Sequence, residues 1–371
     1  MVRTKIVTII GTRPEAIKMA PVIKELERQR DSFEQVIVST AQHKQMLDQV
    51  LHVFSIEPDF DLGLMQENQS LAGFASRSLA SLSEALGRLQ PRAILVQGDT
   101  TTVMTAALAA FYLGIRIGHV EAGLRSFDKR RPFPEEVNRR VGSCLADLHF
   151  APTEGARRNL LAEGVPGPSV HVTGNTIVDA LRMIPLDGRY DDQCLNELYL
   201  NGNRLVLVTA HRRENHGAPL KSICQALKIL TSQFNDVEIV YPVHSNPNVS
   251  SLAYRELGGC PRIHLINPVS YRDLLKLMDR CYMILTDSGG IQEEAPSFGK
   301  PVLILRDVTE RPEVIETGAG RLVGTDARCI VNEARSLLAN PDLYRTMSRA
   351  KNPFGDGHAA ERIVRILSEN V

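Results

Sequence analysis

Short apolar runs, each followed by a turn and then by a helical stretch, recur along the whole chain. In the first half these strand-like runs cover residues 5–10, 35–39, 93–97, 116–120 and 148–151. In the second half they cover residues 205–209, 238–241, 263–266, 282–286 and 301–305. Continuous apolar strands that alternate with helices are typical of parallel sheets covered on both faces. The pattern therefore predicts an α/β protein with doubly wound, Rossmann-like sheets.

A polar stretch at residues 187–203 separates the two groups of runs, and we place the change of domain there. The first predicted domain covers residues 1–185 and the second covers residues 186–353, which fits the roughly 150 residues of an average domain. A last helical stretch follows residues 352–357, and its pattern alone assigns it to neither domain. Ligands of doubly wound sheets bind beyond the carboxyl ends of the strands, so polar residues there are the first candidates for a site.

Composition and charge exclude several classes of protein. Hydrophobic residues make up 43% of the chain and charged residues 23%, which is typical of a folded globular protein and not of a disordered one. The 43 basic residues balance the 43 acidic ones. The net charge therefore gives no reason to expect nucleic acid or an anionic membrane as a partner.

The N-terminus and the cysteines predict a cytoplasmic protein. The apolar run at residues 6–10 is shorter than the roughly 7–15 apolar residues of a signal peptide or the about 20 of a membrane helix. The six cysteines form no CxxC pair, and the nearest two, Cys260 and Cys281, are 21 residues apart. Reduced thiols, without a zinc site, are the expected state.

A glycine-rich turn in the second half is a candidate phosphate site. An apolar run leads into Ser288-Gly289-Gly290, where glycines permit close approach of a ligand and the following helix offers free N–H groups. Glu294, about one turn further on, could accept both hydroxyls of a ribose. A plain strand–helix turn is the alternative reading. The segment matches neither a Walker loop nor the G-x-G-x-x-G fingerprint, which counts against a standard dinucleotide site.

Basic residues follow strands in both halves. Arg13 and Lys18 lie around the start of the first helix and could together bind a diphosphate. His211 and Arg311 follow strands of the second half and suit an anionic leaving group. Solvated charges or structural ion pairs are the alternatives.

Three carboxylates could converge at one crevice of the first half. Asp99 and Glu121 directly follow two apolar strands, and Glu135 opens the next helix, with Arg139 one turn later. Acid–base chemistry on a neutral substrate needs such a set, although each acid alone could be a helix cap. The chain has no His-Glu-x-x-His spacing, so we predict no metal, and no Gly-x-Ser-x-Gly elbow, which weakens acyl transfer.

Ten segments, in order along nearly the whole chain, resemble the non-hydrolysing bacterial UDP-N-acetylglucosamine 2-epimerases. They are GTRPEAIKMAP at 11–21, TAQHKQMLDQVL at 40–51, GDTTT at 98–102, GHVEAGLRS at 118–126, PFPEEVNRR at 132–140, VTGNTIVDAL at 172–181, TAHRREN at 209–215, YPVHSNPNV at 241–249, LTDSGGIQEEAPSFGKPVL at 285–303 and TERPE at 309–313. The loop Thr12-Arg13-Pro14-Glu15 differs from the Ser-Arg-Ala-Glu of hydrolysing relatives and the Ala-Arg-Pro-Gln of diacetamido-uronate epimerases.

The resemblance implies a GT-B-like fold, in which two Rossmann-like domains face a cleft that holds the substrate. It also implies that the C-terminal helix, within residues 354–371, packs back on the first domain, and that residues 269–274 line the uracil pocket. The implied activity is reversible conversion of UDP-GlcNAc to UDP-ManNAc by a homodimer, without NAD or a metal, for cell-surface polysaccharide synthesis.

The implied mechanism is an elimination followed by a re-addition. The C2 hydrogen of the sugar is not acidic, since no carbonyl lies beside it, so a base removes it as UDP departs from C1. The product is 2-acetamidoglucal, and UDP adds back while a proton reaches the other face of C2. Asp99, Glu121 and Glu135 are the candidate acid–base groups, and which one serves which face stays open. The groups expected to stabilise the diphosphate are Arg13, Lys18, His211, Arg311 and Ser288-Gly289-Gly290.

Some members of the family are activated by a second UDP-GlcNAc. The residues that would contact it here are Gln42, His43, Gln45, Glu135, Arg212 and His244. Two departures from the family pattern leave activation open: Asn68 stands where a basic contact is expected, and Arg130-Arg131 replaces an uncharged pair.

Two alternatives come from other functional classes. A glycosyltransferase could use the same fold and the same binding residues for a UDP-sugar, but it would also need an acceptor site. A non-catalytic UDP-sugar sensor would need only binding residues. The three acids at strand ends argue against a sensor, because nucleotide binding alone does not require them.

Overall fold

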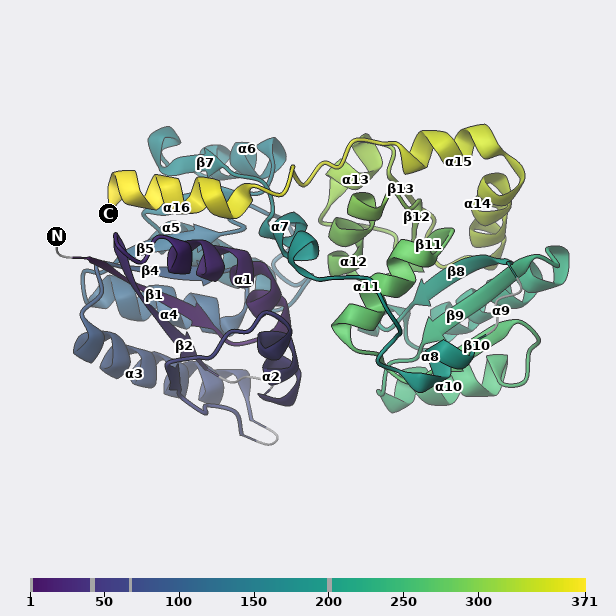
Figure 1. Cartoon of the computed structure of the whole chain (residues 1–371), viewed down its shortest axis with the longest axis horizontal. Helices are drawn as coiled ribbons and strands as arrows, with labels where there is room; N and C mark the ends of the chain where they lie inside the picture. Colours follow the sequence, from purple (N-terminus) through teal and green to yellow (C-terminus); the bar gives the residue numbers. More distant parts are fainter. Residues whose placement is uncertain (1–2, 41–43, 67–68, 199–201) are drawn as a thin grey trace. The chain divides into compact units, whose positions relative to one another are not determined.

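The computed structural model describes residues 3–40, 44–66, 69–198 and 202–371, without the side chains of 44–46. It divides into two compact units. The first unit consists of Met1–Ile184 together with Phe354–Val371, and the second consists of Pro185–Pro353. Each unit holds one parallel sheet with helices on both faces, so the chain has the predicted α/β class (Figure 1).

The first unit contains a seven-stranded sheet in the order β3-β2-β1-β4-β5-β6-β7. Its strands are β1 (Thr4–Ile10), β2 (Phe33–Ser39), β3 (Phe60–Asp61), β4 (Ala93–Gln97), β5 (Arg116–Val120), β6 (Leu148–Ala151) and β7 (Val170–Val172). Its helices are α1 (Arg13–Arg28), α2 (Lys44–Val53), α3 (Leu71–Leu89), α4 (Thr101–Tyr112), α5 (Glu135–Leu145), α6 (Glu154–Ala162), α7 (Thr176–Met183) and α16 (Ala359–Asn370), with the short 3₁₀ helix η1 (Gly167–Ser169).

The second unit contains a six-stranded sheet in the order β10-β9-β8-β11-β12-β13. Its strands are β8 (Arg204–Thr209), β9 (Val237–Pro242), β10 (Ile263–Ile266), β11 (Met283–Thr286), β12 (Val302–Ile304) and β13 (Gly320–Leu322). Its helices are α8 (Gln193–Glu197), α9 (Ala218–Gln233), α10 (Pro247–Leu257), α11 (Tyr271–Arg280), α12 (Gly289–Glu294), α13 (Pro312–Glu316), α14 (Ala327–Ala339) and α15 (Pro341–Ser348), with η2 (Arg213–Asn215) and η3 (Ala295–Phe298).

All ten predicted strands are present, and the structure adds β3, β7 and β13. These three are two or three residues long and lie at the edges of their sheets. Most of their residues are exposed or only partly buried, so they lack the continuous apolar run that marks the equally short but fully buried β12. The longer inner strands are apolar on both faces: on β1, Ile6, Val7, Ile9 and Ile10 are almost completely buried. Helices pack against both faces, which explains why these residues do not alternate with polar ones.

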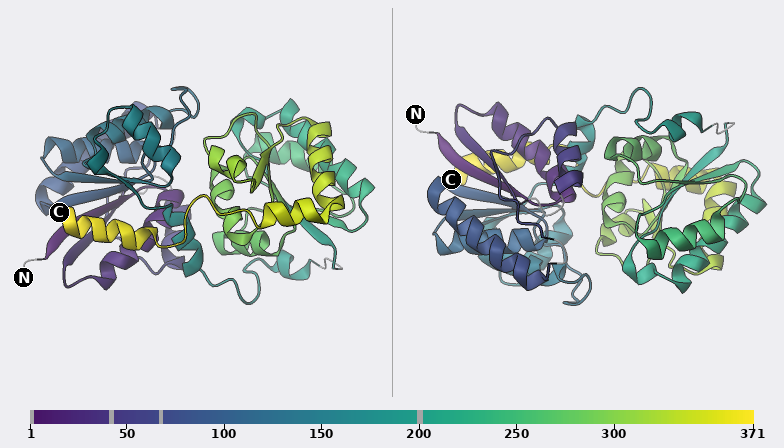
Figure 2. Two further views of the ribbon diagram at one scale, coloured as in Figure 1. Left: turned by 90° about the horizontal axis from the view of Figure 1, so that it is seen from above. Right: turned by 90° about the horizontal axis from the view of Figure 1, so that it is seen from below.

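The C-terminal helix α16 packs against α1 and α7 in the first unit (Figure 2). Asp179 Oδ1, on α7, accepts a hydrogen bond from Ala360 N at 2.9 Å, and Asn175 N donates to Phe354 O at 2.7 Å. The chain therefore returns to its first unit after it completes the second. Within the described ranges, no helix is both long enough and apolar enough to cross a lipid bilayer.

We expect Ile363→Ala to destabilise the first unit by about 2–5 kcal/mol, because Ile363 is fully buried on α16 and its truncation leaves a cavity. Urea unfolding followed by circular dichroism measures the loss. Arg365→Ala, at an exposed position of the same helix, is the matched control and should change the free energy of unfolding by less than about 0.5 kcal/mol. Equal effects of the two substitutions would contradict the docking of α16.

Candidate active site

The predicted acidic and basic residues of the first unit gather at the carboxyl ends of neighbouring strands. Arg13 opens α1 shortly after β1, Asp99 follows β4, and Glu121 directly follows β5. β1, β4 and β5 are adjacent and parallel, so their carboxyl ends meet at one edge of the sheet. The fold therefore brings residues that are far apart in the sequence to one edge, where doubly wound sheets bind their ligands.

Lys18 and Glu121 form a buried ion pair. Lys18 Nζ contacts Glu121 Oε2, and each side chain is only 8% exposed. Asn175 Nδ2, just before α7, donates to the same carboxylate oxygen at 3.3 Å. The sequence predicts Lys18 as a diphosphate contact, whereas the structure places its ammonium group on a carboxylate. The ion pair and the Asn175 amide therefore hold the Glu121 carboxylate in place at the end of β5.

The backbone of Glu121 adopts a left-handed conformation, with φ 65°. This region is uncommon for a residue with a long side chain, and such strain concentrates at functional sites. The conformation turns the chain sharply at the end of β5. It supports a functional role for Glu121 and argues against a simple helix cap, since Glu121 precedes no helix directly.

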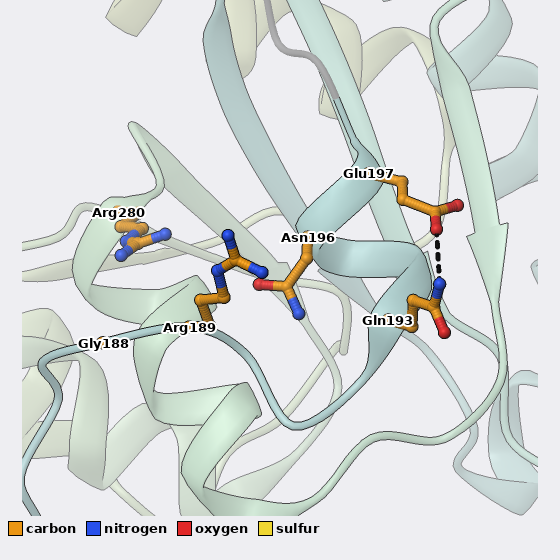
Figure 3. Close-up of a pocket in the computed structure, with 6 residues that line it drawn as sticks. All are labelled: Gly188, Arg189, Gln193, Asn196, Glu197 and Arg280. Carbon is orange, nitrogen blue, oxygen red and sulfur yellow. Dashed lines mark hydrogen bonds between the residues drawn. The ribbon is translucent and has the colours of Figure 1, made fainter.

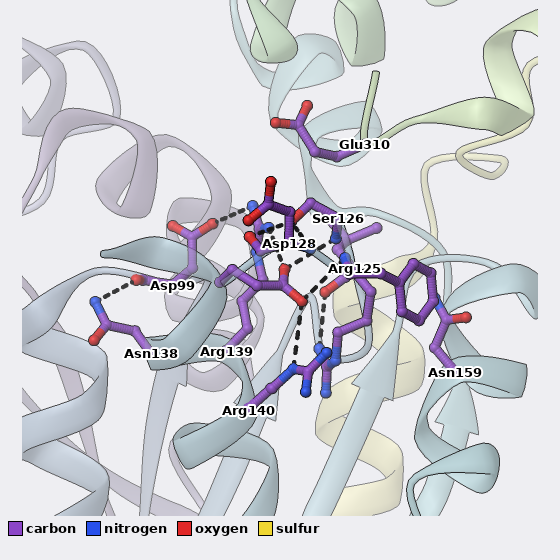
Figure 4. Close-up of polar contacts among 12 residues, drawn as sticks. Asp99, Arg125, Ser126, Asp128, Asn138, Arg139, Arg140, Asn159 and Glu310 are labelled. Carbon is purple, nitrogen blue, oxygen red and sulfur yellow. Dashed lines mark hydrogen bonds and ion pairs between the residues drawn. The ribbon is translucent and has the colours of Figure 1, made fainter. Parts of the chain in front are cut away.

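Asp99 is paired with Arg139, as Figure 4 shows. The distance from Arg139 Nη2 to Asp99 Oδ2 is 2.6 Å, and Asn138 Nδ2 donates to the backbone carbonyl of Asp99 at 2.9 Å. Arg139 Nη1 also lies 3.2 Å from Glu136 Oε2. The sequence predicts that Arg139 orients Glu135 or meets the substrate; the structure shows it bridging Asp99 and Glu136.

Glu135 and Glu136 are neighbours at the start of α5 with different surroundings. Glu135 is half-buried at the first position of the helix. Glu136 is fully buried and accepts hydrogen bonds from Ser126 N at 2.9 Å and Phe127 N at 3.3 Å. Glu136 therefore holds the loop that follows β5. The sequence does not reveal this role, because it shows only two adjacent glutamates.

Glu15 is a buried acid that the sequence does not assign to the site. It is 1% exposed, and Glu15 Oε2 accepts hydrogen bonds from Gly11 N at 2.6 Å and Thr12 N at 2.8 Å. The hydroxyl of Thr100 donates to Glu15 Oε1. Burial raises the pKa of Glu15 to about 7, so this carboxyl is partly neutral near neutral pH. Glu15 is the third residue of α1 and follows the N-cap residue Thr12. This spacing is the pattern of a capping box, so the sequence indicates no further role for Glu15.

His119, on β5, fixes the loop that carries Asp99. Its Nε2 atom lies 2.7 Å from the carbonyl oxygen of Gly98, which can only accept, so Nε2 carries the proton. Burial lowers the pKa of His119 to about 4, and the ring is therefore neutral at neutral pH. His119 lies two positions before Glu121 in the sequence, but its side chain contacts the loop that follows the neighbouring strand, β4.

In the second unit, the predicted phosphate turn lies beside Arg311. A Cβ atom on Gly289 would come within 2.6 Å of Arg311 Nη1, so only glycine leaves room for the guanidinium group. Arg311 Nε donates to Glu293 Oε1 at 2.6 Å, which holds the side chain in place. α12 has only six residues, Gly289–Glu294, and hence a small dipole. The positive charge at this turn therefore comes chiefly from Arg311.

Asp287, directly before the glycine turn, organises the loop that follows β8. Its Oδ2 atom accepts from His211 N and Arg212 N at 2.8 Å and from Asn215 Nδ2 at 2.9 Å. The imidazole of His211 stacks on that of His244, with ring centroids 5.3 Å apart. The structure thus brings together His211, Arg212 and His244. Of the other predicted activator contacts, Glu135 belongs to the first unit, and Gln42, His43 and the side chain of Gln45 lie outside the described residues. Asn68, which departs from the family pattern, also lies outside them.

Glu294 lies at the end of α12 and is almost completely buried. Tyr271 Oη, at the start of α11, donates to Glu294 Oε1 at 2.8 Å. This hydrogen bond fixes the carboxylate that the sequence predicts as a ribose contact. Tyr271 also lies within residues 269–274, the segment for which the resemblance implies a uracil pocket.

A charged network supports this part of the second unit. Arg306 Nε donates to Glu214 Oε1 at 2.6 Å and Arg306 Nη1 to Glu310 Oε2 at 2.8 Å. Burial alone would raise the pKa of Glu310, but Arg311 and Arg306 outweigh it and lower that pKa to about 2. Nothing in the spacing of Arg306 along the sequence marks it as part of this network.

A pocket of about 490 Å³ lies elsewhere in the second unit (Figure 3). It is lined by Gly188, Arg189, Gln193, Asn196, Glu197 and Arg280. It contains none of the predicted site residues. Among the described side chains, no group of three or more His, Cys, Asp or Glu residues is arranged to hold a metal ion.

Two parallel sheets, each with helices on both faces, are the architecture of GT-B-like proteins. Residues 24–368 match the family model of UDP-N-acetylglucosamine 2-epimerase. The chain is 49% identical over 367 residues to the UDP-N-acetylglucosamine 2-epimerase of Bacillus subtilis, covering 99% of this chain and 96% of that protein. It is 50% identical over 369 residues to that of Salmonella typhimurium, covering 98% of each chain. The chain belongs to the UDP-N-acetylglucosamine 2-epimerase family.

A solved structure supports the same assignment. The crystal structure of UDP-GlcNAc 2-epimerase from Neisseria meningitidis bound to UDP-GlcNAc matches with a TM-score of 0.92 and 44% sequence identity. The match covers 99% of this chain and 100% of that chain. The resemblance first indicated by short motifs therefore extends over the whole fold.

We predict that Gly289→Ala weakens UDP binding at least about tenfold, or about 1.4 kcal/mol, because the added methyl group displaces the guanidinium of Arg311. Isothermal titration calorimetry with UDP measures the change. Gly87→Ala on α3, where a Cβ would meet nothing within 4 Å, is the matched control. Unchanged UDP affinity in Gly289→Ala would remove Arg311 from the proposed nucleotide site.

Proposed function

We propose that this enzyme interconverts UDP-GlcNAc and UDP-ManNAc by inverting C2 of the sugar. The observation that carries the proposal is the arrangement at the edge of the first sheet, where Glu121 pairs with Lys18 and Asp99 pairs with Arg139. Each carboxylate is held in a fixed orientation by its cation, and a fixed carboxylate can serve as a proton-transfer group. Membership of the epimerase family supports the choice of substrate.

The chemistry follows from the weak acidity of C2–H. One carboxylate removes the C2 proton while the C1–O bond to UDP breaks, which leaves a C1–C2 double bond in 2-acetamidoglucal. UDP then attacks C1 again, and a second group delivers a proton to the opposite face of C2. Proton loss and gain balance, and no atom changes its net oxidation state, so the cycle needs no redox partner. Asp99, Glu121 and Glu135 supply the acid–base groups, with their individual faces unassigned.

The second unit supplies the nucleotide contacts in this proposal. Arg311 and His211, assisted by Arg13 from the first unit, stabilise the diphosphate as negative charge builds on the leaving group. Donors of this kind can each contribute roughly 3 kcal/mol in a site closed to water. Glu294, held by Tyr271, receives the ribose hydroxyls. The Ser288-Gly289-Gly290 turn lets the phosphates approach the backbone.

We also propose a homodimer that works in the cytoplasm and supplies ManNAc for surface polysaccharide. Phe111, Tyr112 and Leu113, at the end of α4, are exposed apolar residues that a second subunit could cover. The six cysteines are free thiols, as in proteins of a reducing compartment. Activation by a second UDP-GlcNAc is part of the proposal, with Arg212 and His244 near His211 as its contacts. Initial rates that depend hyperbolically on UDP-GlcNAc would contradict activation.

Proton NMR in deuterated buffer tests the reaction directly. With UDP-GlcNAc and no added NAD or metal, we expect signals of UDP-ManNAc to grow while the C2 proton signal disappears. Asp99→Asn, Glu121→Gln and Glu135→Gln should each lower turnover by about 10²-fold or more without unfolding the protein, because each removes a proton-transfer group. Asp128→Asn, at an exposed carboxylate of the nearby loop, is the control and should keep turnover near that of the wild type.

Other outcomes would support other functions. Free ManNAc with UDP would indicate the hydrolysing reaction. Release of UDP only when a sugar acceptor is added would indicate a glycosyltransferase. Tight binding of UDP-GlcNAc without exchange at C2 would indicate a sensor. Normal turnover in any one acid variant would remove that residue from the catalytic set.

A further inference from the structure

Glu15 lies where two loops of the first unit meet. One loop, Gly11-Thr12, follows β1, and the other, Gly98-Asp99-Thr100, follows β4. Glu15 Oε2 accepts the two backbone N–H groups of the first loop, and Glu15 Oε1 accepts the hydroxyl of Thr100 in the second. A single buried carboxylate therefore ties the ends of two neighbouring strands together.

The packing around this link is tight. A Cβ atom on Gly11 would lie 2.5 Å from Thr40 Oγ1, 2.6 Å from Thr102 Oγ1 and 3.2 Å from Glu15 Oε2. Thr40 and Thr102 are hydrogen-bonded to each other at 3.1 Å. Gly11 therefore packs directly against Thr40 and Thr102, and we expect a change at Glu15 to alter the position of the loop that leads into Arg13.

Asp99 is the residue that this link positions. The carbonyl of Gly98, directly before it, is held by His119; its own carbonyl is held by Asn138; and the hydroxyl of Thr100, directly after it, is held by Glu15. The Asp99 side chain then meets Arg139 at 2.6 Å. Of these anchors, the link to Glu15 joins the Asp99 loop to the loop that leads into Arg13.

We propose that Glu15 is a positioning residue, which acts through Thr100 to hold Asp99 in its catalytic orientation. This inference rests on the proposed function, because Asp99 is placed there in the acid–base set. A capping role alone requires only the hydrogen bond to Thr12 N. The contacts to Gly11 N and Thr100 go beyond a cap, as does the burial of a carboxyl group, which is costly unless hydrogen bonds satisfy it.

The test compares the turnover of four variants by the NMR assay. Thr100→Val removes the hydroxyl that links the loops and should lower kcat about 10- to 100-fold, while UDP affinity stays within about twofold of the wild type. Glu15→Ala should lower kcat by at least as much. The double variant should match Glu15→Ala in kcat, because without Glu15 the Thr100 hydroxyl no longer links the loops and only accepts the helix-capping hydrogen bond from Val103 N. Thr100→Ser, which keeps the hydroxyl, should stay within about threefold of the wild type.

Two further variants separate positioning from general stability. Glu15→Gln can still accept from Gly11 N and Thr12 N and can donate to Thr100, so it should recover most of the turnover that Glu15→Ala loses. Asp179→Asn is the matched control: Asp179 is also a buried carboxyl that accepts a backbone N–H, from Ala360, and burial raises its pKa as well. It lies on α7, where its hydrogen-bond partner Ala360 belongs to α16 and to neither loop, and the variant should keep normal kcat.

Several results would overturn the inference. One is Thr100→Val turning over within twofold of the wild type. Another is a double variant whose losses in log kcat simply add. A third is a loss in Thr100→Val that appears in UDP affinity instead of kcat. If Glu15→Ala does not fold, the comparison of Thr100→Val with Thr100→Ser decides the question. Absence of epimerisation in the wild type would instead remove the proposed function itself.

Discussion

The parallel pairing of β1 with β4 and of β4 with β5 is the constraint on which the site depends. It brings the carboxyl ends of three strands to one edge and so gathers the loops that carry Arg13, Asp99 and Glu121. The apolar interior that holds the strands in register, such as Ile9, Ile94 and Ile117, lies between helices on both faces. Hydrophobic burial thus fixes the strand ends, and the strand ends position the loops that carry the polar site residues.

Charged site residues in both units form ion pairs. Lys18 with Glu121 and Arg139 with Asp99 serve the first unit, and Arg311 with Glu293 serves the second. A buried ion pair contributes little net stability, because desolvation of both partners offsets their attraction. What the pairs supply is fixed geometry: acids and cations are already oriented before a substrate arrives, so little reorganisation accompanies the reaction. The left-handed backbone of Glu121 fits the same interpretation, since strain is retained where position matters.

The sequence allowed most of the fold to be predicted, and its errors have physical causes. Inner strands have continuous apolar runs, whereas the edge strands β3, β7 and β13 have exposed or partly exposed residues and show none. The site residues that were missed share a different cause. Glu15 has the spacing of a helix cap, and His119 lies inside a strand, where a buried histidine is an ordinary core residue. Their roles depend on hydrogen bonds to residues on other strands, which spacing along the chain does not contain.

By itself the sequence determined the α/β class, the succession of strands and helices, the acids and glycines at the strand ends, and, through its motifs, the family. These are local properties, because periodicity and short runs of residue types are enough to indicate them. The tertiary structure alone decided which charges meet: that Lys18 lies on Glu121, that Arg139 joins Asp99 to Glu136, and that Glu15 links two loops. The reason is physical, because sheet order and helix packing set contacts between residues far apart in the chain, and no local pattern encodes those contacts.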